Sequence, residues 1–570
     1  MSASSAAAAP APAGTELSHR QILSIMSGLM LGMFLAALDQ TIVASAMRTI
    51  GDDLHGLSIQ AWVTTAYLIT ATISTPLYGK LSDIYGRKPM FLTAISIFLV
   101  GSALCSFSTS MYMLAAFRAL QGLGAGGLFT LALAIMADIV PPRERARYQG
   151  YFLAVFGTSS VIGPVVGGFF AGQATILGIA GWRWVFLVNV PLAIAALVVV
   201  QRVLNIPHTR RDHRIDWQGA AALTVCLVPL LVVAEQGRGW GWGSVGSVTC
   251  YLFGLLGLAA FLLAERMAGE EALIPLRMFR NKTFSMTSTV GLITGMGMFG
   301  VIVSLPLYLQ IVKGASPTKA GLLTVPLVFG IMGGSVIAGQ MIARTGRYRI
   351  YPIIGSALMV VGAVLFTRIG ADTPFWETAL FMPVFGLGLG LVMQPVVLAV
   401  QNAMPPQDVG VATASSTFFR QIGGTLGTAV FLSVLFSTVG DKIASAFGKA
   451  AQTPAFQEAL KDPSVLANPA NKQVIEALQS GAAGGGGATA NAANALNDSS
   501  FIQRLSDVLA YPFKVGFSDA MHTVYWMGAG VLSIAFVVLL FLPEVPLRTQ
   551  SAMAQRETDA AEAAQAAGLL

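Results

Sequence analysis

In the first half of the chain, two charged residues lie deep inside long apolar runs of the sequence. The first is Asp39, within the stretch from Leu38 to Val43, and it is the only acidic residue well inside any such run. An ionised carboxylate at that depth costs on the order of 2.5–3.5 kcal/mol on a lenient insertion scale, so it must be paired, hydrated or protonated. Asp39 is therefore a candidate proton carrier, with a static ion pair between helices as the alternative.

The second of these charges is Arg118, in the stretch from Arg118 to Gly124. At about 1.5 Å per helical residue, Asp39 lies roughly 12 Å and Arg118 roughly 10 Å from the outer ends of their apolar runs. We therefore expect the two side chains at similar depth, in contact directly or through water. In that position Arg118 would compete with a proton for the carboxylate.

The elements that must hold these charges are membrane-spanning helices. The chain is 55% hydrophobic and 11% charged, whereas a typical soluble domain is about 25% charged. Apolar runs of about 20 residues are long enough to cross a bilayer. Fourteen such runs are expected at residues 22–47, 60–79, 90–108, 112–138, 147–172, 183–203, 217–235, 244–264, 283–311, 318–343, 350–368, 377–402, 411–438 and 522–542.

The distribution of Lys and Arg predicts the orientation in the membrane. With an even number of spans, twenty basic residues fall in the inner short segments and tails, and six fall in the outer short segments. Because short cytoplasmic segments carry the excess of basic residues, both termini are expected to be cytoplasmic. The protein is thus predicted to be a multi-pass protein of the inner or plasma membrane, with the long segment 439–521 facing outward.

The chain also repeats itself internally. Gly79, Gly86 and Arg87 recur 260 positions later, and the pair Gly122 and Gly124 recurs 264 positions later. Two similar halves with a substrate site between them are typical of transporters. We expect a cytoplasmic tail at 1–21, a six-helix bundle at 22–203, a linker with two inserted helices at 204–268, a second six-helix bundle at 269–543 and a cytoplasmic tail at 544–570.

Two further motifs, together with the segments around Asp39 and Arg118, carry a family resemblance. One is Gly79-Lys-Leu-Ser-Asp83-Ile-Tyr-Gly86-Arg87-Lys88, read as an eight-residue turn between two spans. The other lies in the fifth span and contains Gly157, Gly163, Pro164, Gly167 and Gly168. Small residues four apart let helices approach closely, and a proline removes a backbone hydrogen bond and bends the helix.

These motifs resemble the major facilitator superfamily and, within it, the fourteen-span drug:proton antiporters similar to QacA and EmrB. The resemblance implies that Asp39 and Arg118 couple transport to protons and that the 79–88 loop is a cytoplasmic gate. The fifth-span motif implies export. The expected function is proton-coupled export of amphiphilic small molecules by alternating access. Export of an endogenous lipid or metabolite, proton:solute symport and a non-transporting membrane sensor or scaffold are the alternatives.

The substrate cavity is expected to be mostly apolar with a few polar groups. Candidate lining residues are Trp62, Tyr67, Gln121, Tyr308, Gln310, Gln394, Phe419 and Arg420. Arg420, an intramembrane cation of the second half, was considered as an anion-binding group or as a partner for Asp39. The stretch from Trp182 to Pro191, which includes Asn189, was interpreted as an interfacial anchor with a structural role.

Other classes of protein find no support in the sequence. No phosphate-binding loop, metal-ligand spacing or catalytic motif occurs, so neither an enzyme nor a cofactor is expected, and the proton motive force would drive transport. Three scattered cysteines form no disulfide framework, and the dispersed basic residues form no patch for nucleic acid. Expected partners are protons, lipids and a small amphiphilic or lipid-like substrate. Segment 439–521 was interpreted as a mouth cap, a membrane-surface element, a docking site for an envelope partner, or a poorly ordered linker.

Overall fold

Long helices make up nearly all of the computed structural model, which describes residues 18–55, 60–205, 215–479, 500–551, 553–555 and 558. In this described part, twelve helices are long and apolar enough to cross a membrane. The predicted all-α membrane architecture is confirmed. Two further helices at predicted spans, α2 (Gln60–Tyr85) and α13 (Ile350–Phe366), lie outside that twelve. The number fourteen therefore stays a prediction.

The first half of the chain forms one group of packed helices. α1 packs on α5, and α4 packs on both α2 and α3. The remaining bounds are α1 (His19–Asp53), α3 (Arg87–Ser106), α4 (Met111–Ile139), α5 (Pro142–Ala171), η2 (Gly181–Arg183), α6 (Trp184–Leu187) and α7 (Asn189–Val203). A hairpin of β1 (Thr175–Ile176) and β2 (Ile179–Ala180) joins α5 to η2.

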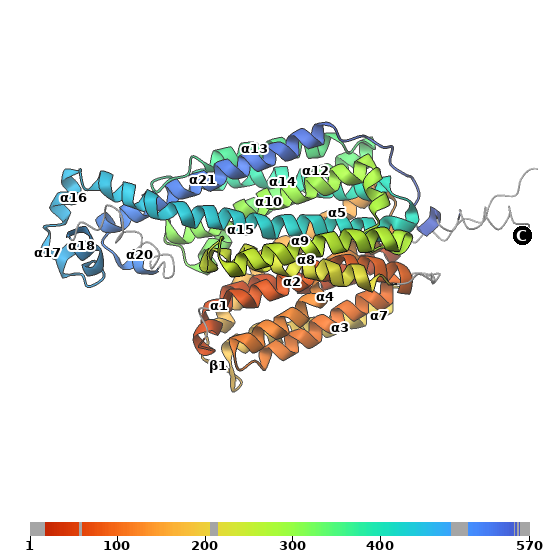
Figure 1. Cartoon of the computed structure of the whole chain (residues 1–570), viewed down its shortest axis with the longest axis horizontal. Coiled ribbons are helices and arrows are strands. Elements are labelled where there is room, and N and C mark those ends of the chain that lie inside the picture. Colours follow the sequence, from red (N-terminus) through yellow and green to blue (C-terminus); the bar gives the residue numbers. More distant parts are fainter. Residues whose placement is uncertain are drawn as a thin grey trace, which may run out of the picture.

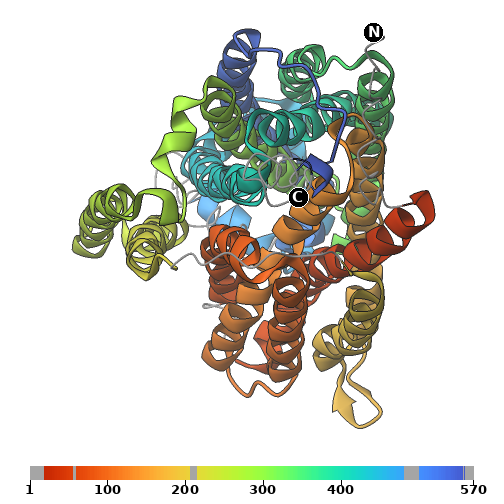
Figure 2. The ribbon, with the colours of Figure 1, turned by 90° about the vertical axis from the view of Figure 1, so that its right-hand side faces the viewer.

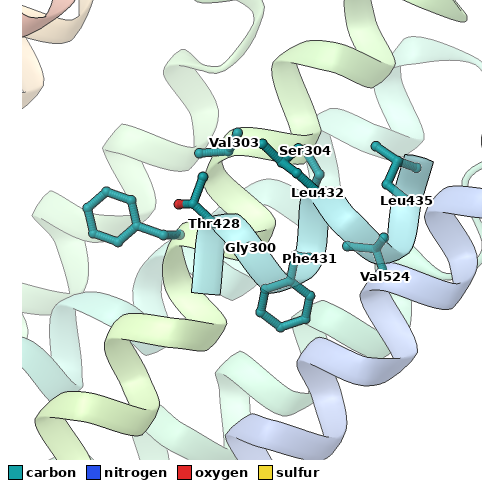
Figure 3. Close-up of a pocket in the computed structure, with 9 residues that line it drawn as sticks. Gly300, Val303, Ser304, Thr428, Phe431, Leu432, Leu435 and Val524 are labelled. Carbon is teal, nitrogen blue, oxygen red and sulfur yellow. The ribbon is translucent and has the colours of Figure 1, made fainter. Parts of the chain in front are cut away.

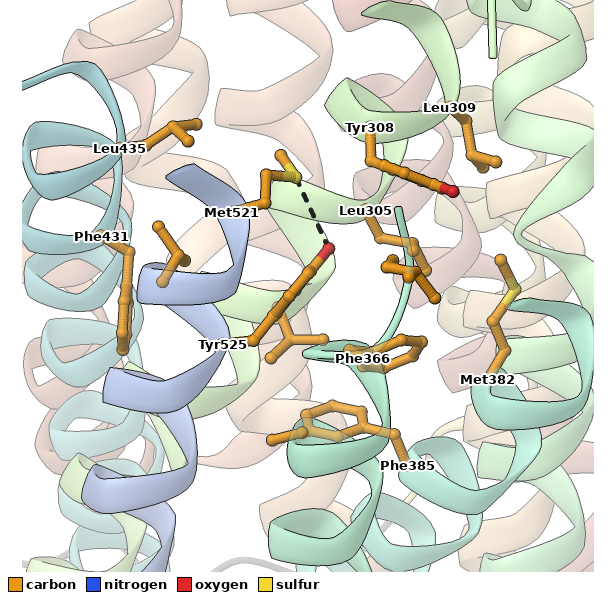
Figure 4. Close-up of a cluster of buried hydrophobic side chains, with 14 of the residues drawn as sticks. Leu305, Tyr308, Leu309, Phe366, Met382, Phe385, Phe431, Leu435, Met521 and Tyr525 are labelled. Atoms are coloured by element: carbon orange, nitrogen blue, oxygen red, sulfur yellow. Dashed lines mark hydrogen bonds between the residues drawn. The ribbon is translucent and has the colours of Figure 1, made fainter. Parts of the chain in front are cut away.

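The second half forms a similar group. α10 packs on α15, α14 packs on α12 and α13, and α21 packs on α10, α13 and α15. Its bounds are α10 (Lys282–Ile311), α11 (Pro317–Leu323), α12 (Val325–Thr345), α14 (Phe375–Ala403), η5 (Pro406–Asp408), α15 (Val409–Ala450) and α21 (Asp507–Leu540). Its largest apolar cluster includes Tyr308, Phe366, Phe385 and Tyr525, which gather between these helices (Figure 4).

A pair of helices stands beside the seam between the two halves. α8 (Trp217–Trp240) and α9 (Val245–Ala268) pack on each other, and α8 also touches α2 and α15. Figure 2 shows this pair off to one side, with the first half below and the second half above. Two short turns, η3 (Gly269–Glu271) and η4 (Leu276–Arg280), lead from the pair into α10. This packing supports the predicted division into two bundles and a linker, whose limits stay a prediction; residues 1–17, 206–214 and 559–570 lie outside the described residues.

The internal repeat recurs as physical contacts between helices. A Cβ added at Gly122 of α4 would lie 2.4 Å from the carbonyl oxygen of Tyr67 in α2. In the second half, a Cβ added at Gly386 of α14 would lie 2.2 Å from the carbonyl oxygen of Leu327 in α12. Close approach of helix backbones through small residues is how membrane helices pack without a hydrophobic driving force between them. In both halves, therefore, a glycine of one helix packs closely against a backbone carbonyl of a neighbouring helix.

The described parts of the long segment 439–521, residues 439–479 and 500–521, are largely helical. α15 continues to Ala450 and α21 already begins at Asp507, so both helices extend well beyond the predicted spans. Between them lie α16 (Pro454–Ala459), α17 (Pro463–Ala467), α18 (Lys472–Gln479) and α20 (Ser500–Arg504), which we call the cap. Buried Asn471 joins the two sides of the cap, because it accepts from the Ser506 amide at 3.0 Å and donates to the Val465 carbonyl at 2.8 Å. The predicted Gly-rich centre falls in 480–499, outside the described residues.

The two ends of the bundle differ. Figure 1 shows the cap and the β1–β2 hairpin at one end, the cap end, and the C-terminal segment at the other, the tail end. α1 also begins at the tail end, where Ser18 and Gln21 form a capping box that satisfies the free amides of its first turn.

Candidate functional site

A polar cluster around Asp39 is buried among the helices of the first half. Asp39 is fully buried, and its Oδ2 accepts a hydrogen bond from Nη1 of Arg118 at 2.5 Å. Its Oδ1 accepts from Nε2 of Gln121 and from Nδ2 of Asn189, both at 2.8 Å. Helices α1, α4 and α7 each supply part of this cluster, so its geometry depends on the packing of the whole half.

Arg118 is held from two further sides. Its Nη1 donates to Oε1 of Gln121 at 2.7 Å, and its guanidinium carbon lies 4.0 Å from the centre of the Tyr67 ring. A cation over an aromatic face gains stabilisation when it is desolvated. Gln121 and Tyr67, predicted to line the substrate cavity, therefore lie in the shell that fixes the charged pair.

Asn189 was missed as a functional residue by sequence reasoning. Its amide bridges Asp39 and Oγ of Ser102, at 2.8 and 3.1 Å, and Ser102 in turn donates to the Phe186 carbonyl at 3.0 Å. Trp182, from the same stretch, donates to Asp53 at 2.6 Å, and its role as an interfacial anchor stays a prediction. No signal in the sequence separated Asn189 from that anchor.

A fully buried ion pair of this kind can act chemically as a proton switch. Removing one partner of a buried pair leaves an uncompensated charge, which costs roughly 3–5 kcal/mol. Protonation of Asp39 would release Arg118 from its counter-charge while the hydrogen bonds from Gln121 and Asn189 could persist on Oδ1. The cluster is thus able to link one proton to a rearrangement of α1 against α4.

A second charged cluster lies at the tail end, around Arg87. The side chain of Arg87 is buried, and it pairs with Asp83 and with Asp138 of α4, each at 2.7 Å. It also donates to Oγ of Ser82. Lys88, another predicted gate residue, is partly buried and donates to the Gln201 carbonyl of α7 at 2.7 Å.

The expected eight-residue turn between Gly79 and Gly86 is wrong. α2 continues to Tyr85 and α3 begins at Arg87, so the chain reverses at Gly86 alone. Gly86 has a φ of 98°, a left-handed conformation that glycine adopts without steric cost. Gly79 lies inside α2 and serves close packing instead, since a Cβ there would lie 2.4 Å from Cβ of Ala414.

This cluster meets the other half at the start of α15. A Cβ added at Gly410 would lie 2.4 Å from Oδ1 of Asp83 and 2.6 Å from Nη1 of Arg87. Nearby, Nη1 of Arg145 donates to Oε1 of Gln401 in α14 at 2.7 Å. The halves are therefore joined at the tail end by buried polar contacts.

The linker takes part in the same junction. Nζ of Lys80 donates to the carbonyl oxygen of Glu270 in η3 at 3.0 Å, and Arg277 of η4 pairs with Asp408 at 3.1 Å. A polar cavity of about 140 Å³ lies between these groups and is also lined by Asp83. The inserted pair of helices is thus tied to both halves at one point.

The glycines of the fifth-span motif lie at close contacts between helices. A Cβ on Gly163 would lie 2.0 Å from Oγ1 of Thr41, and one on Gly167 would lie 2.1 Å from Oγ of Ser45. Gly157 faces Val328 of α12 in the same way at 2.6 Å. A Cβ on Gly168 would lie 3.1 Å from Oγ1 of Thr318, and one on Gly321 would lie 3.2 Å from Cγ of Pro164. α5 stays one helix across this proline. The motif therefore packs α5 against both α1 and the second half.

Gly163→Ala is expected to lower the melting temperature of the purified protein, because the added methyl group must push α5 away from Thr41. Overpacking of this kind typically costs about 1–3 kcal/mol. Gly150→Ala on the same helix is the matched control, since its Cβ would meet nothing nearer than 3.7 Å. Equal melting temperatures for the two variants would contradict this interpretation of the motif.

The other predicted cavity residues are scattered. Tyr308 is buried and donates to the Gly370 carbonyl at 2.9 Å. Phe419 packs edge-on against Phe279, with 5.9 Å between the ring centres. Gln394 is 7% exposed, and Trp62 and Gln310 are partly buried. Arg420 does not pair with Asp39, whose charge is met by Arg118.

Comparisons with known proteins agree with this geometry. The family model described as Major Facilitator Superfamily matches residues 29–428. The chain is 32% identical over 545 residues to the multidrug transporter protein MdtP of Bacillus subtilis, covering 94% of this chain and 96% of that protein. It is 35% identical over 424 residues to multidrug resistance protein 3 of the same organism, covering 74% and 81% of the two chains.

Solved structures show the same fold at low sequence identity. The proton:xylose symporter XylE matches with a TM-score of 0.58 and 15% identity, covering 95% of this chain and 99% of that one. The human organic anion transporter MFSD10 matches with a TM-score of 0.53 and 17% identity, covering 72% and 93%.

Proposed function

The chain belongs to the major facilitator superfamily, and on this premise we propose that it is a proton-coupled antiporter that exports amphiphilic small molecules by alternating access. The observation that carries the proposal is the buried cluster in which Asp39 pairs with Arg118. A charged pair inside a membrane bundle is costly, and such residues mark ion pathways and proton relays in membrane proteins.

In the proposed cycle, Asp39 takes up a proton from the outer side and releases it to the cytoplasm. Protonation frees Arg118 from its counter-charge, and deprotonation restores the pair and favours substrate binding. The bonds from Gln121 and Asn189 keep the carboxylate oriented in both states, so that one proton changes charge without dismantling the cluster.

The contacts around Arg87 serve as the cytoplasmic gate of this cycle. In the orientation that the basic residues predict, the tail end is cytoplasmic and the protein lies in the cell membrane. Asp83 sits at the first turn of α15, where a carboxylate is favoured by the positive end of the helix dipole. This contact stabilises the arrangement in which the halves are joined at the tail end and substrate leaves outward.

Export rather than uptake is supported by the names of the relatives and by the fifth-span motif. Both Bacillus subtilis relatives are named for multidrug transport or resistance. Export of an endogenous lipid or metabolite is the alternative for the substrate, and proton:solute symport is the less favoured alternative for direction.

The test is a substrate panel on proteoliposomes that contain the purified full chain and carry an imposed proton gradient. We expect amphiphilic compounds to move against their own concentration gradient, in the direction opposite to the protons, and a protonophore to stop this movement. Substrate that moves in the same direction as the protons would support symport and overturn the proposal.

A further inference from the structure

Arg420 is a second intramembrane cation, and the proton cluster does not use it. It lies eleven residues into α15, roughly 16 Å from the start of that helix and thus near the middle of a bilayer about 30 Å thick. Its side chain is partly accessible, and among the described residues the guanidinium has no hydrogen bond or ion pair. Such a charge is costly and must be hydrated or paired, and no described residue supplies the pair.

The contacts around α15 show where Arg420 projects. Gln421 faces α2, since its Oε1 accepts from Oγ1 of Thr75 at 3.1 Å, while Ile422 faces α8. Gly423 faces α10. At about 100° per residue, position 420 lies between the α10 side and the α2 side, away from α8. Arg420 therefore projects toward the seam between the halves rather than toward the linker pair.

On the α10 side, Arg420 meets a glycine and, one turn further along, an aromatic ring. Gly291 of α10 faces it without a side chain, at 3.9 Å from the Arg420 Cβ to a Cβ added there. One turn further along α15, the ring of Phe299 covers Gly424, and 37% of the Phe299 side chain stays exposed. The same face of α15 continues to Thr428, where a narrow crevice opens.

That crevice is too narrow to hold a water molecule, but its apolar lining extends the apolar surface along α15 beyond Phe299. Its lining, drawn in Figure 3, comes from α10, α15 and α21 and comprises Phe299, Gly300, Val303, Ser304, Thr428, Phe431, Leu432, Leu435 and Val524. A cation at one end of an apolar strip matches a molecule with an anionic head and an apolar body. Asp39 is paired with Arg118, so it does not neutralise Arg420.

We propose that Arg420 binds the anionic group of an amphiphilic substrate, a carboxylate, sulfonate or phosphate, whose apolar part lies against the exposed face of Phe299. The inference rests on the proposed transport function and names its substrate class. An arginine can hold such a group with two parallel hydrogen bonds. Thr75 of α2 contacts Gln421, the neighbour of Arg420, and Tyr67 of α2 contacts Arg118. Because Tyr67 and Thr75 are eight positions apart on one helix, the proton and anion sites lie roughly 12 Å apart along α2.

The test is equilibrium binding to the purified full chain in phosphatidylcholine nanodiscs, with no gradient imposed. Three fluorescent probes share a dansyl-undecyl body and end in a carboxylate, a carboxamide or a trimethylammonium group. We expect the wild type to bind the carboxylate at least about tenfold more tightly than the carboxamide, as for a charge-assisted hydrogen bond. Arg420→Gln should remove this preference without changing carboxamide affinity, and Arg420→Lys should retain part of it.

Arg368→Gln, which removes an exposed arginine after α13, is the matched control and should keep the full preference. A wild type without preference, a preference that survives Arg420→Gln, or an equal loss for all three probes would overturn the inference. These outcomes are separate from failure of proton coupling, because an exporter driven in another way would still show the carboxylate preference.

A second arm identifies the source of the anion. Phosphatidylglycerol is added to the nanodiscs, and the carboxylate probe is titrated again. If the lipid is the natural occupant, it competes with the probe in the wild type but not in Arg420→Gln. If a free solute is the occupant, the wild-type preference is unchanged by the lipid. Either result leaves an anionic amphiphile as the ligand class.

Discussion

Asp39→Asn is expected to abolish uphill export driven by a proton gradient and to slow downhill substrate movement without abolishing it. The amide has the shape of the carboxylate, and Arg118 keeps its contacts with Oε1 of Gln121 and the ring of Tyr67. The fold should therefore persist. The amide cannot take up or release a proton, however, so position 39 stays uncharged, as it is when Asp39 is protonated.

The measurement is transport in proteoliposomes, with a proton gradient in one arm and only a substrate gradient in the other. Asp52→Asn is the matched control, because Asp52 lies on the same helix but is exposed near its cap-end terminus, and it should transport like the wild type. Uphill export by Asp39→Asn at the wild-type rate would show that the Asp39–Arg118 pair is only a static link between helices.

Arg87→Gln is expected to destabilise the closed tail end by about 3–5 kcal/mol, because it leaves the carboxylates of Asp83 and Asp138 without their shared cation. We expect lower thermal stability and easier opening of the tail end. The repeat offers an unusually close control: Arg347 occupies the equivalent position in the second half and is exposed. Arg347→Gln should change stability by no more than about 0.5 kcal/mol.

Opening of the tail end can be followed at Ala137, which is fully buried against Val409 of the second half. An Ala137→Cys chain without Cys105, Cys226 and Cys250 should react slowly with an impermeant thiol reagent, and Arg87→Gln should speed the reaction. If Arg87→Gln and Arg347→Gln behave alike, the cluster at Arg87 does not hold the halves together.

The charged members of the site were predictable from sequence because charges inside apolar runs are rare. Asp39 and Arg118 stand out for that reason, and counting residues along helices placed them at similar depth. Asn189 and Ser102 could not be found in this way. Uncharged polar residues occur throughout membrane helices, and only the packing of α7 and α3 against α1 brings these two to Asp39.

The glycines show a similar limit. Repeat spacing identified Gly79, Gly86 and Gly122 as important, but a glycine can serve a turn or a close contact, and spacing does not separate the two. At Gly86 the backbone has positive φ, whereas Gly79 lies inside a helix and packs on Ala414. The eight-residue turn was predicted wrongly because both glycines were assigned the first use.

The spans predicted at the cap end were too short, for another reason. Hydropathy reports where a helix leaves the hydrocarbon layer, not where its backbone hydrogen bonds end. α15 and α21 therefore extend past the predicted limits at 438 and 522. Their extensions pack on each other through contacts such as Gly516 on Ile443, and the apolar core of the second half continues along them into the cap.

These extensions give the second half a lever arm. α15 is one continuous helix of 42 residues, about 63 Å long, and its far end carries the cap together with α21. A tilt of roughly 10° at the tail end would swing a body about 60 Å away through about 10 Å, because a helix transmits rotation as a stiff rod. The distance between a fluorophore on the cap and one on the β1–β2 hairpin would then change with the tilt of α15, and it could report the state of the transport cycle.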